Sequence, residues 1–236
     1  QVAADSTGAL AGLMVEPYLG AAGFIFPPDG FLIELEKWCR DRGVLFTLDE
    51  VQSSYGRTGK MWAMDWENIT PDLVAIGKGI GNGIPTSAVA ARGEVIDCLN
   101  KGEMSSTVGG NPVSSAAVVA ILEVMQREKL ADNALRMGEY MINRLRNTQE
   151  KSRHLGDVRG RGLVMGLELV RDKKTKEPAP DLTKKLIDTC AANGLLIGSV
   201  GIYGNVIRVA PPLCITEAEA DESCELMEKS LLAIEK

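Results

Sequence analysis

Histidine and paired cysteines are scarce in this sequence. Its one histidine is His154, and its five cysteines include no Cys-x-x-Cys pair. Zinc sites are built from closely spaced cysteine and histidine ligands, so these spacings exclude a zinc site. Scattered cysteines in odd number are typical of free thiols in a reducing compartment, and we expect a cytoplasmic protein. His154 lies in a polar stretch, where we interpret it as structural or solvent-facing.

An excess of positive charge and long apolar runs are also missing. The 236 residues carry 26 Lys and Arg against 32 Asp and Glu, a net charge of −6. This balance provides no basic surface for nucleic acid or an anionic membrane, and no apolar run reaches the length of a membrane span. The first residues have neither the basic start of a signal peptide nor an initiating Met. We therefore expect no nucleic-acid or membrane partner, and a chain cut from a longer one.

Helical and extended patterns alternate along the chain, which is typical of α/β proteins. With 45% hydrophobic and 25% charged residues, the composition is that of a globular protein of one large or two smaller domains. Apolar runs predict strands over 12–17, 44–50, 73–78 and 86–92, and helical spacing of apolar residues predicts a helix over 31–42. The run 44–50 is apolar almost throughout, as expected for a parallel strand buried on both faces.

The pattern changes after residue 112. It predicts helices over 113–127, 130–147, 181–193 and 217–234, and strands over 158–170, 195–199 and 205–211. Thr216 is a suitable N-cap for the last helix. We place a domain boundary within the helices near 125–130. Residues 1–127 would then belong to a larger α/β domain, and residues 128–236 would form a smaller α+β domain with an antiparallel sheet.

Two ionisable residues, Asp49 and Lys78, lie at the ends of two predicted parallel strands. Ligands of open α/β sheets bind beyond the carboxyl ends of the strands. An amine there can form an imine with the aldehyde of pyridoxal phosphate, and a carboxylate can keep the cofactor's pyridine nitrogen protonated. A buried Asp–Lys ion pair would explain the same two residues. The segment GKGIGNG around Lys78 is not a nucleotide-binding phosphate loop, because Gly79 follows the lysine where such a loop has Ser or Thr.

Five motifs in order run through almost the whole chain. They are LDEVQSSYGRTGKM, PDLVAIGKGIGNGIP, STVGGNP, GDVRGRGLVMGLELV and IRVAPPLCIT. With them the sequence closely resembles the class III aminotransferases, pyridoxal-phosphate enzymes of fold type I that include 4-aminobutyrate, ornithine and acetylornithine transaminases. The resemblance implies that the chain is the C-terminal part of a fold type I large domain, a mostly parallel sheet with helices, followed by a smaller C-terminal domain.

The resemblance also implies a role for each residue that matches a family motif. Lys78 resembles the lysine that forms the Schiff base with the cofactor and later shuttles a proton between substrate and cofactor. Asp49 resembles the partner of the pyridine nitrogen, Val51 the residue that packs on one face of the ring, and Gln52 the contact to the phenolic oxygen. Thr107 resembles the residue that donates to the cofactor phosphate of the neighbouring subunit, which implies a homodimer.

Arg208 resembles the arginine that holds a substrate carboxylate in a bidentate contact. A domain-interface ion pair would explain the same residue. Several family members have a glutamate that pairs with this arginine and swings away for a second substrate. The matching position here is Ala21, so that exchange is absent and Arg208 would serve both half-reactions.

The resemblance predicts a transaminase that moves an amino group from an amino acid, such as the ω-amino acid 4-aminobutyrate, to a 2-oxo acid. A racemase or epimerase, a decarboxylating transaminase, and a non-catalytic fragment are the alternatives. The family also has an N-terminal region with a small-residue phosphate loop and an aromatic side chain that stacks on the cofactor. Neither is in this sequence, so we expect a fragment, or a missing half supplied by another chain.

Overall fold

The computed structural model describes residues 8–235, and these residues form two compact units. The first unit contains the described residues up to Pro17, Pro27–Tyr55 and Met61–Lys129. The second contains Tyr18–Phe26, Gly56–Lys60 and the chain from Leu130 on. The division of the sequence into domains at 127/128 stays a prediction. In the structure, helix α4 ends at Arg127 and helix α5 begins at Leu130.

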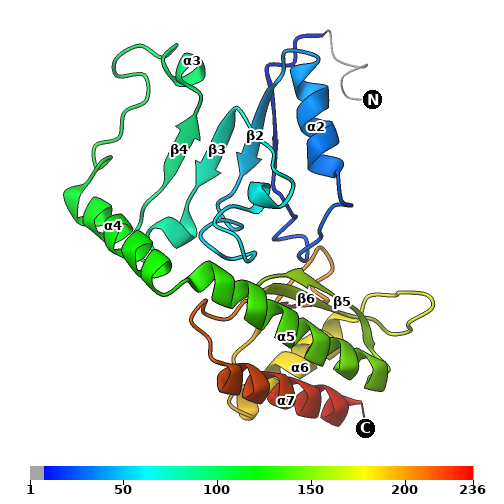
Figure 1. Cartoon of the computed structure of the whole chain (residues 1–236). Coiled ribbons are helices and arrows are strands. Elements are labelled where there is room, and N and C mark those ends of the chain that lie inside the picture. The colour runs from blue at the N-terminus through cyan, green and yellow to red at the C-terminus, as the bar shows by residue number, and fades with distance from the viewer. Residues whose placement is uncertain (1–7, 236) are drawn as a thin grey trace. The chain divides into compact units, whose positions relative to one another are not determined.

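The first unit is built on a four-stranded sheet with the order β1-β2-β3-β4 (Figure 1). The strands are β1 (Gly12–Val15), β2 (Leu45–Asp49), β3 (Leu73–Ile76) and β4 (Ala88–Ala91). The first three are parallel, and β4 runs antiparallel at the edge. All four predicted strands are therefore confirmed. The pairing of β2 with β3 brings Asp49 opposite Ala75.

Helix α2 (Phe31–Arg40) packs against strand β2. Leu32 and Cys39 on its inner face are buried in one apolar cluster with Phe46 and Leu48 of the strand. The outer face carries the ion pairs Lys37–Asp41 and Arg40–Glu36, each four residues apart on the helix. The remaining helices of the unit are the 3-10 turns η1 (Ala63–Trp66) and η2 (Lys78–Ile80), then α3 (Gly93–Ile96) and α4 (Pro112–Arg127).

The second unit contains a fully antiparallel sheet with the order β5-β6-β8-β7. Its strands are β5 (Leu155–Arg161), β6 (Val164–Leu169), β7 (Gly198–Val200) and β8 (Val206–Val209). The prediction of one glycine-interrupted strand over 158–170 is wrong, because this segment is a hairpin. The chain reverses at Gly162, whose φ of +58° is strained for any side chain, and a Cβ there would lie 2.4 Å from the carbonyl carbon of Thr58. The strand period is the same in both arms, so the sequence pattern does not reveal the reversal.

Helices α5 (Leu130–Lys151), α6 (Pro180–Ala192) and α7 (Glu217–Ile234) pack with this sheet around the larger apolar core. The core includes Met137 and Leu145 of α5, Leu167 of β6, Leu186 of α6 and Leu231 of α7, all at most 1% exposed. The predicted cap is confirmed. Thr216 Oγ1 accepts from the Glu219 backbone N–H at 3.3 Å, and Glu219 Oε2 accepts from the Thr216 N–H at 2.8 Å.

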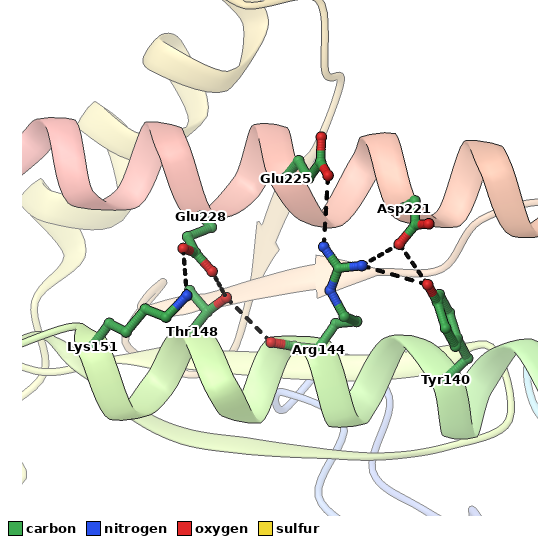
Figure 2. A network of polar contacts seen from close by, with 7 residues as sticks. All are labelled: Tyr140, Arg144, Thr148, Lys151, Asp221, Glu225 and Glu228. Atoms are coloured by element: carbon green, nitrogen blue, oxygen red, sulfur yellow. Dashed lines mark hydrogen bonds and ion pairs between the residues drawn. The ribbon is translucent and has the colours of Figure 1, made fainter.

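A ladder of polar contacts joins α5 to α7 (Figure 2). Tyr140 donates to Asp221 Oδ1 at 2.5 Å, and Arg144 also contacts this carboxylate and lies 3.9 Å from Glu225. One turn further on, Thr148 and Lys151 donate to Glu228 at 3.0 and 2.7 Å. Partner numbers rise together on both helices, so the two helices run parallel. Because the charged groups remain partly exposed, we assign the ladder to helix register more than to stability.

Two segments from the first half of the sequence belong to the second unit. Arg159 of β5 holds the turn at Gly23 and Phe24 through three hydrogen bonds to their carbonyls, including Nη2 to the Gly23 carbonyl at 2.7 Å. Arg57 donates from Nη1 to the Leu163 and Pro211 carbonyls at 2.9 and 2.7 Å. Both arginines bond to backbone carbonyls and so satisfy main-chain acceptors. Tyr18 and Phe24 of the first segment are also buried against Val164.

Candidate active site

Asp49 and Lys78 lie at the same edge of the first unit's sheet. Asp49 is the last residue of β2, and Lys78 follows the end of the adjacent parallel strand β3. Because parallel strands present their carboxyl ends at one edge, both side chains originate there. The register places Asp49 opposite Ala75, three residues before the lysine. The arrangement expected from the two sequence motifs is therefore present.

The backbone at Lys78 is strained. Its φ is +47°, in the left-handed region that non-glycine residues rarely adopt, and its side chain is exposed. The two glycines that flank it make close contacts that leave little room for a side chain. A Cβ at Gly77 would lie 3.1 Å from Val51 Cγ1, and a Cβ at Gly79 would lie 3.1 Å from Tyr55 Cβ. The lysine loop is thus seated against the segment that follows Asp49.

Asp49 is half-buried, and its Oδ1 accepts from the backbone N–H of Val51 at 3.0 Å. This bond closes a small turn that fixes Val51 beside Gly77. Gln52 is half-buried in the same turn. The structure therefore brings Asp49, Val51, Gln52 and Lys78 into one region of the first unit.

These residues fit the cofactor predicted from the sequence. An exposed amine and a half-buried carboxylate at one sheet edge provide the two groups that a pyridine aldehyde requires. Gly77 has no side chain and packs closely against Val51, so nothing projects from position 77 between Val51 and the lysine. No group of three or more His, Cys, Asp or Glu side chains that could hold a metal ion occurs among residues 8–235.

Thr107 lies elsewhere in the first unit, on an exposed loop that precedes α4. Asn111 ends this loop and caps the helix, since its Oδ1 accepts from the N–H groups of Val113 and Ser114 at 2.9 and 3.3 Å. The loop is therefore anchored at its helical end while the Thr107 side chain faces solvent.

Arg208 belongs to the second unit, where it is exposed on β8. Its cross-strand neighbours are Gly166 on β6 and Gly198 on β7. Paired residues in an antiparallel sheet share a face, so glycine on both sides leaves the guanidinium without a flanking side chain in the next strands. The Ala21 carbonyl accepts from Gly201 N at 3.0 Å, which holds the turn of Ala21 onto the end of β7.

Glu50, a fully buried carboxylate at this sheet edge, is not among the residues predicted from the sequence. Its residue is 0% exposed, although it directly follows Asp49. Its Oε1 accepts from Met64 N at 2.8 Å, and its Oε2 accepts from Ser53 Oγ. Successive residues of a strand point to opposite faces, so the pair Asp49-Glu50 at the end of an apolar run already carried a signal that one acid points into the core.

Glu50 makes the stability of the first unit dependent on pH. Burial raises its pKa above the ordinary 4.5, although hydrogen bonds from Ser53 and the Met64 N–H oppose the shift. A raised folded-state pKa stabilises the fold most below pH 4.5, and this contribution is lost as pH rises through the folded pKa. We expect the free energy of unfolding of the wild type, minus that of Glu50→Gln, to fall as the pH rises from 4.5 through the folded-state pKa of Glu50. Urea unfolding at a series of pH values measures this difference. A difference that is constant with pH would contradict the burial of a titrating carboxyl group.

Comparison with known proteins identifies relatives over nearly the whole chain. The sequence profile of the family described as Aminotransferase class-III matches residues 1–231. An alanine/serine racemase of Pyrococcus horikoshii is 40% identical over 94% of the chain and 46% of its own length. The alanine–glyoxylate aminotransferase 2 homolog 2 of Arabidopsis thaliana is 42% identical over 96% of the chain and 47% of its own length. A 4-aminobutyrate aminotransferase of Mycobacterium leprae is 38% identical over 98% of the chain and 51% of its own length. The chain thus spans about half the length of these relatives.

A solved structure of similar fold contains the cofactor in question. The ornithine aminotransferase of Toxoplasma gondii matches 97% of the chain and 52% of its own with a TM-score of 0.89 and 34% identity. That protein has partial occupancy of pyridoxal phosphate at its active site. Sequence and fold therefore lead to the same group of proteins.

Proposed function

We propose, on the premise that this chain belongs to the class III aminotransferases, that the protein transfers an amino group from an amino acid to a 2-oxo acid. The observation that carries the proposal is the exposed Lys78 amine and the half-buried Asp49 carboxylate at the carboxyl ends of adjacent parallel strands. The ion-pair alternative explains two charges, but it gives no reason for the strained lysine or for its glycine-lined contact with Val51.

Pyridoxal phosphate, when bound, supplies an aldehyde for an amine and a ring that accepts electrons from the substrate's α-carbon. Lys78 Nζ would hold the cofactor covalently until the substrate's amine takes its place. The freed Nζ would act as the base that removes the proton from the substrate's α-carbon and then as the acid that donates it to the cofactor. Asp49, held by the Val51 N–H, would keep a proton on the ring nitrogen by its negative charge.

The other predicted contacts are part of the same proposal. Val51, fixed between Asp49 and Gly77, would cover one face of the ring, and Gln52 would donate to its phenolic oxygen. Thr107 would donate its hydroxyl to the cofactor phosphate of a second copy, which makes the active protein a homodimer. Its exposed position on a loop anchored by Asn111 leaves it accessible to such a copy. We keep the cytoplasm as the expected location, where the five cysteines remain free thiols as they are in this structure.

Arg208 would hold the substrate's carboxylate, with Ala21 at the position where some family members place a competing glutamate. The supporting observation is that glycines flank Arg208 on both neighbouring strands. An amino donor with a carboxylate, such as 4-aminobutyrate or alanine, and a 2-oxo acid acceptor would then use the same arginine in turn.

Replacement of this arginine tests the substrate assignment. We expect Arg208→Ala to raise the KM for carboxylate substrates by about 100-fold, because a bidentate charge-assisted contact is lost. Simple amines without a carboxylate should react at nearly unchanged rates in the same variant. Measurement of kcat and KM for one acid and one plain amine separates the outcomes, and an equal loss for both would assign Arg208 to the structure of the sheet.

Racemisation is the second candidate, favoured by the similarity to the alanine/serine racemase of Pyrococcus horikoshii. Racemisation would begin with the same amine and carboxylate, but it would need an acid on the opposite face of the α-carbon to return the proton. A panel of amino donors and 2-oxo acids with the protein at its natural length distinguishes the two. Stoichiometric formation of a new 2-oxo acid supports amino transfer, and formation of the enantiomer without a 2-oxo acid supports racemisation.

A further inference from the structure

Glu50 occupies the position where the Asp49 turn meets the rest of the first unit. Its backbone N–H donates to the Ala75 carbonyl at 3.0 Å, which extends the pairing of β2 with β3 one residue beyond Asp49. Its own carbonyl accepts from both the N–H and the hydroxyl of Ser54, at 3.2 and 2.6 Å. The main chain of Glu50 is thus bonded on both sides, to β3 and to the turn that follows.

The side chain of Glu50 connects that turn to a second segment. Oε2 accepts from Ser53 Oγ inside the turn, and Oε1 accepts from Met64 N at 2.8 Å, within η1. Glu50 is 0% exposed to solvent. A buried carboxylate is costly unless donors reach both of its oxygens, and here each oxygen has at least one. Because Glu50 is bonded to both segments, we expect its side chain to hold the turn and η1 together.

We propose that Glu50 is a positioning residue for the cofactor site, which it serves by fixing the turn that carries Asp49, Val51 and Gln52 to η1. The proposal rests on the proposed function, since the site is the one assigned to pyridoxal phosphate. Asp49 Oδ1 is held by the Val51 N–H, and Val51 in turn contacts Gly77 beside Lys78. Displacement of the turn would therefore move the carboxylate and one wall of the site together.

Glutamine at position 50 is the conservative replacement. Its Oε1 can still accept from Met64 N, and its Nε2 can donate to Ser53 Oγ, because a hydroxyl also accepts. Alanine removes both contacts and leaves the Met64 N–H and the Ser53 hydroxyl without this partner. Leu32→Ala is the matched control, since Leu32 is 4% exposed in the α2–β2 core, and Met64 packs against that core with its side chain while its backbone N–H bonds Glu50. It should destabilise the first unit without displacing Asp49.

The test is an equilibrium titration of each variant's cofactor-free protein, at natural length, with pyridoxal phosphate, followed by absorbance. We expect Glu50→Ala to weaken binding by about tenfold or more and to shift the pH at which the bound chromophore titrates. Glu50→Gln should stay within about threefold of the wild type. Leu32→Ala should lower the melting temperature and leave both the affinity and the chromophore's pH profile unchanged.

Each other outcome has one meaning. Wild-type affinity and an unshifted chromophore in Glu50→Ala would overturn the inference while leaving the proposed function in place. An equal loss in Leu32→Ala would overturn it as well, because general destabilisation would then explain the effect. If Glu50→Ala does not fold, Ser53→Ala removes the contact within the turn alone, and it must shift the chromophore's pH profile or the inference fails. A wild type that binds no pyridoxal phosphate refutes the proposed function itself.

Discussion

Lys78→Ala is expected to abolish covalent attachment of pyridoxal phosphate and to lower the turnover rate by at least about 10⁴-fold. The lysine is the amine proposed to hold the cofactor and to move the proton, so one substitution removes both actions. Its side chain is exposed and its backbone is strained at φ +47°. Loss of the side chain should therefore cost little stability, which separates the expected defect from unfolding.

Borohydride reduction followed by peptide mass measurement reports the covalent attachment directly. In the wild type the reduced cofactor should be found on the peptide that contains Lys78, and in Lys78→Ala it should be found on no peptide. Lys101→Ala is the control, since Lys101 is an exposed lysine of the same unit. Added small amines such as methylamine should restore part of the proton transfer in Lys78→Ala. Turnover of the unassisted variant at the wild-type rate would refute the assignment of Lys78.

The parallel strands could be predicted because they are apolar along their whole length. Residues 44–50 and 73–78 are each a short apolar run ending in a charged residue, and both are central parallel strands in the structure. In the structure one face of each strand is buried and the other is half-buried, so a mainly apolar composition was enough to mark them. Asp49 and Lys78 could be found for the same reason, because charge at the end of a buried strand contrasts with what precedes it.

The hairpin at Gly162 could not be predicted from composition or period. Apolar residues continue from Leu163 to Val170 after the turn, and nothing in their order distinguishes a reversal from a bulge. Glycine is required at this reversal because the Thr58 backbone, from a segment more than 100 residues earlier in the chain, approaches it closely. A contact of that separation is a property of the fold and has no local sequence signal.

Glu50 and Arg57 show a second limit of sequence reasoning. Both are charged residues in a stretch that reads as a strand end followed by a turn, where exposure is the ordinary expectation. In the structure each is directed at backbone groups, Glu50 at the Met64 N–H and Arg57 at the Leu163 and Pro211 carbonyls. Burial also lowers the pKa of Arg57. The positions of those backbone groups on other segments explain why Glu50 is buried and Arg57 half-buried.

Asp49→Asn should weaken pyridoxal-phosphate binding and slow removal of the α-proton by about 10² to 10³-fold, the effect of losing a partly buried charge opposite a cation. Asparagine keeps the shape and an oxygen that can accept from the Val51 N–H, so the turn is retained and only the charge is removed. Without that charge the ring nitrogen loses its proton near neutral pH, and the ring accepts electrons less readily.

The rate of α-proton exchange with solvent deuterium, followed by mass spectrometry on the substrate, measures this step without requiring the complete transfer. In Asp49→Asn this exchange should slow while Lys78 still attaches the cofactor covalently, since the amine is unchanged. Asp41→Asn, at the exposed end of α2, is the matched control and should behave as the wild type. Exchange at the wild-type rate in Asp49→Asn would leave Asp49 as the acceptor of the Val51 N–H alone. The chemistry assigned to this sheet edge would then have no group that keeps the ring protonated.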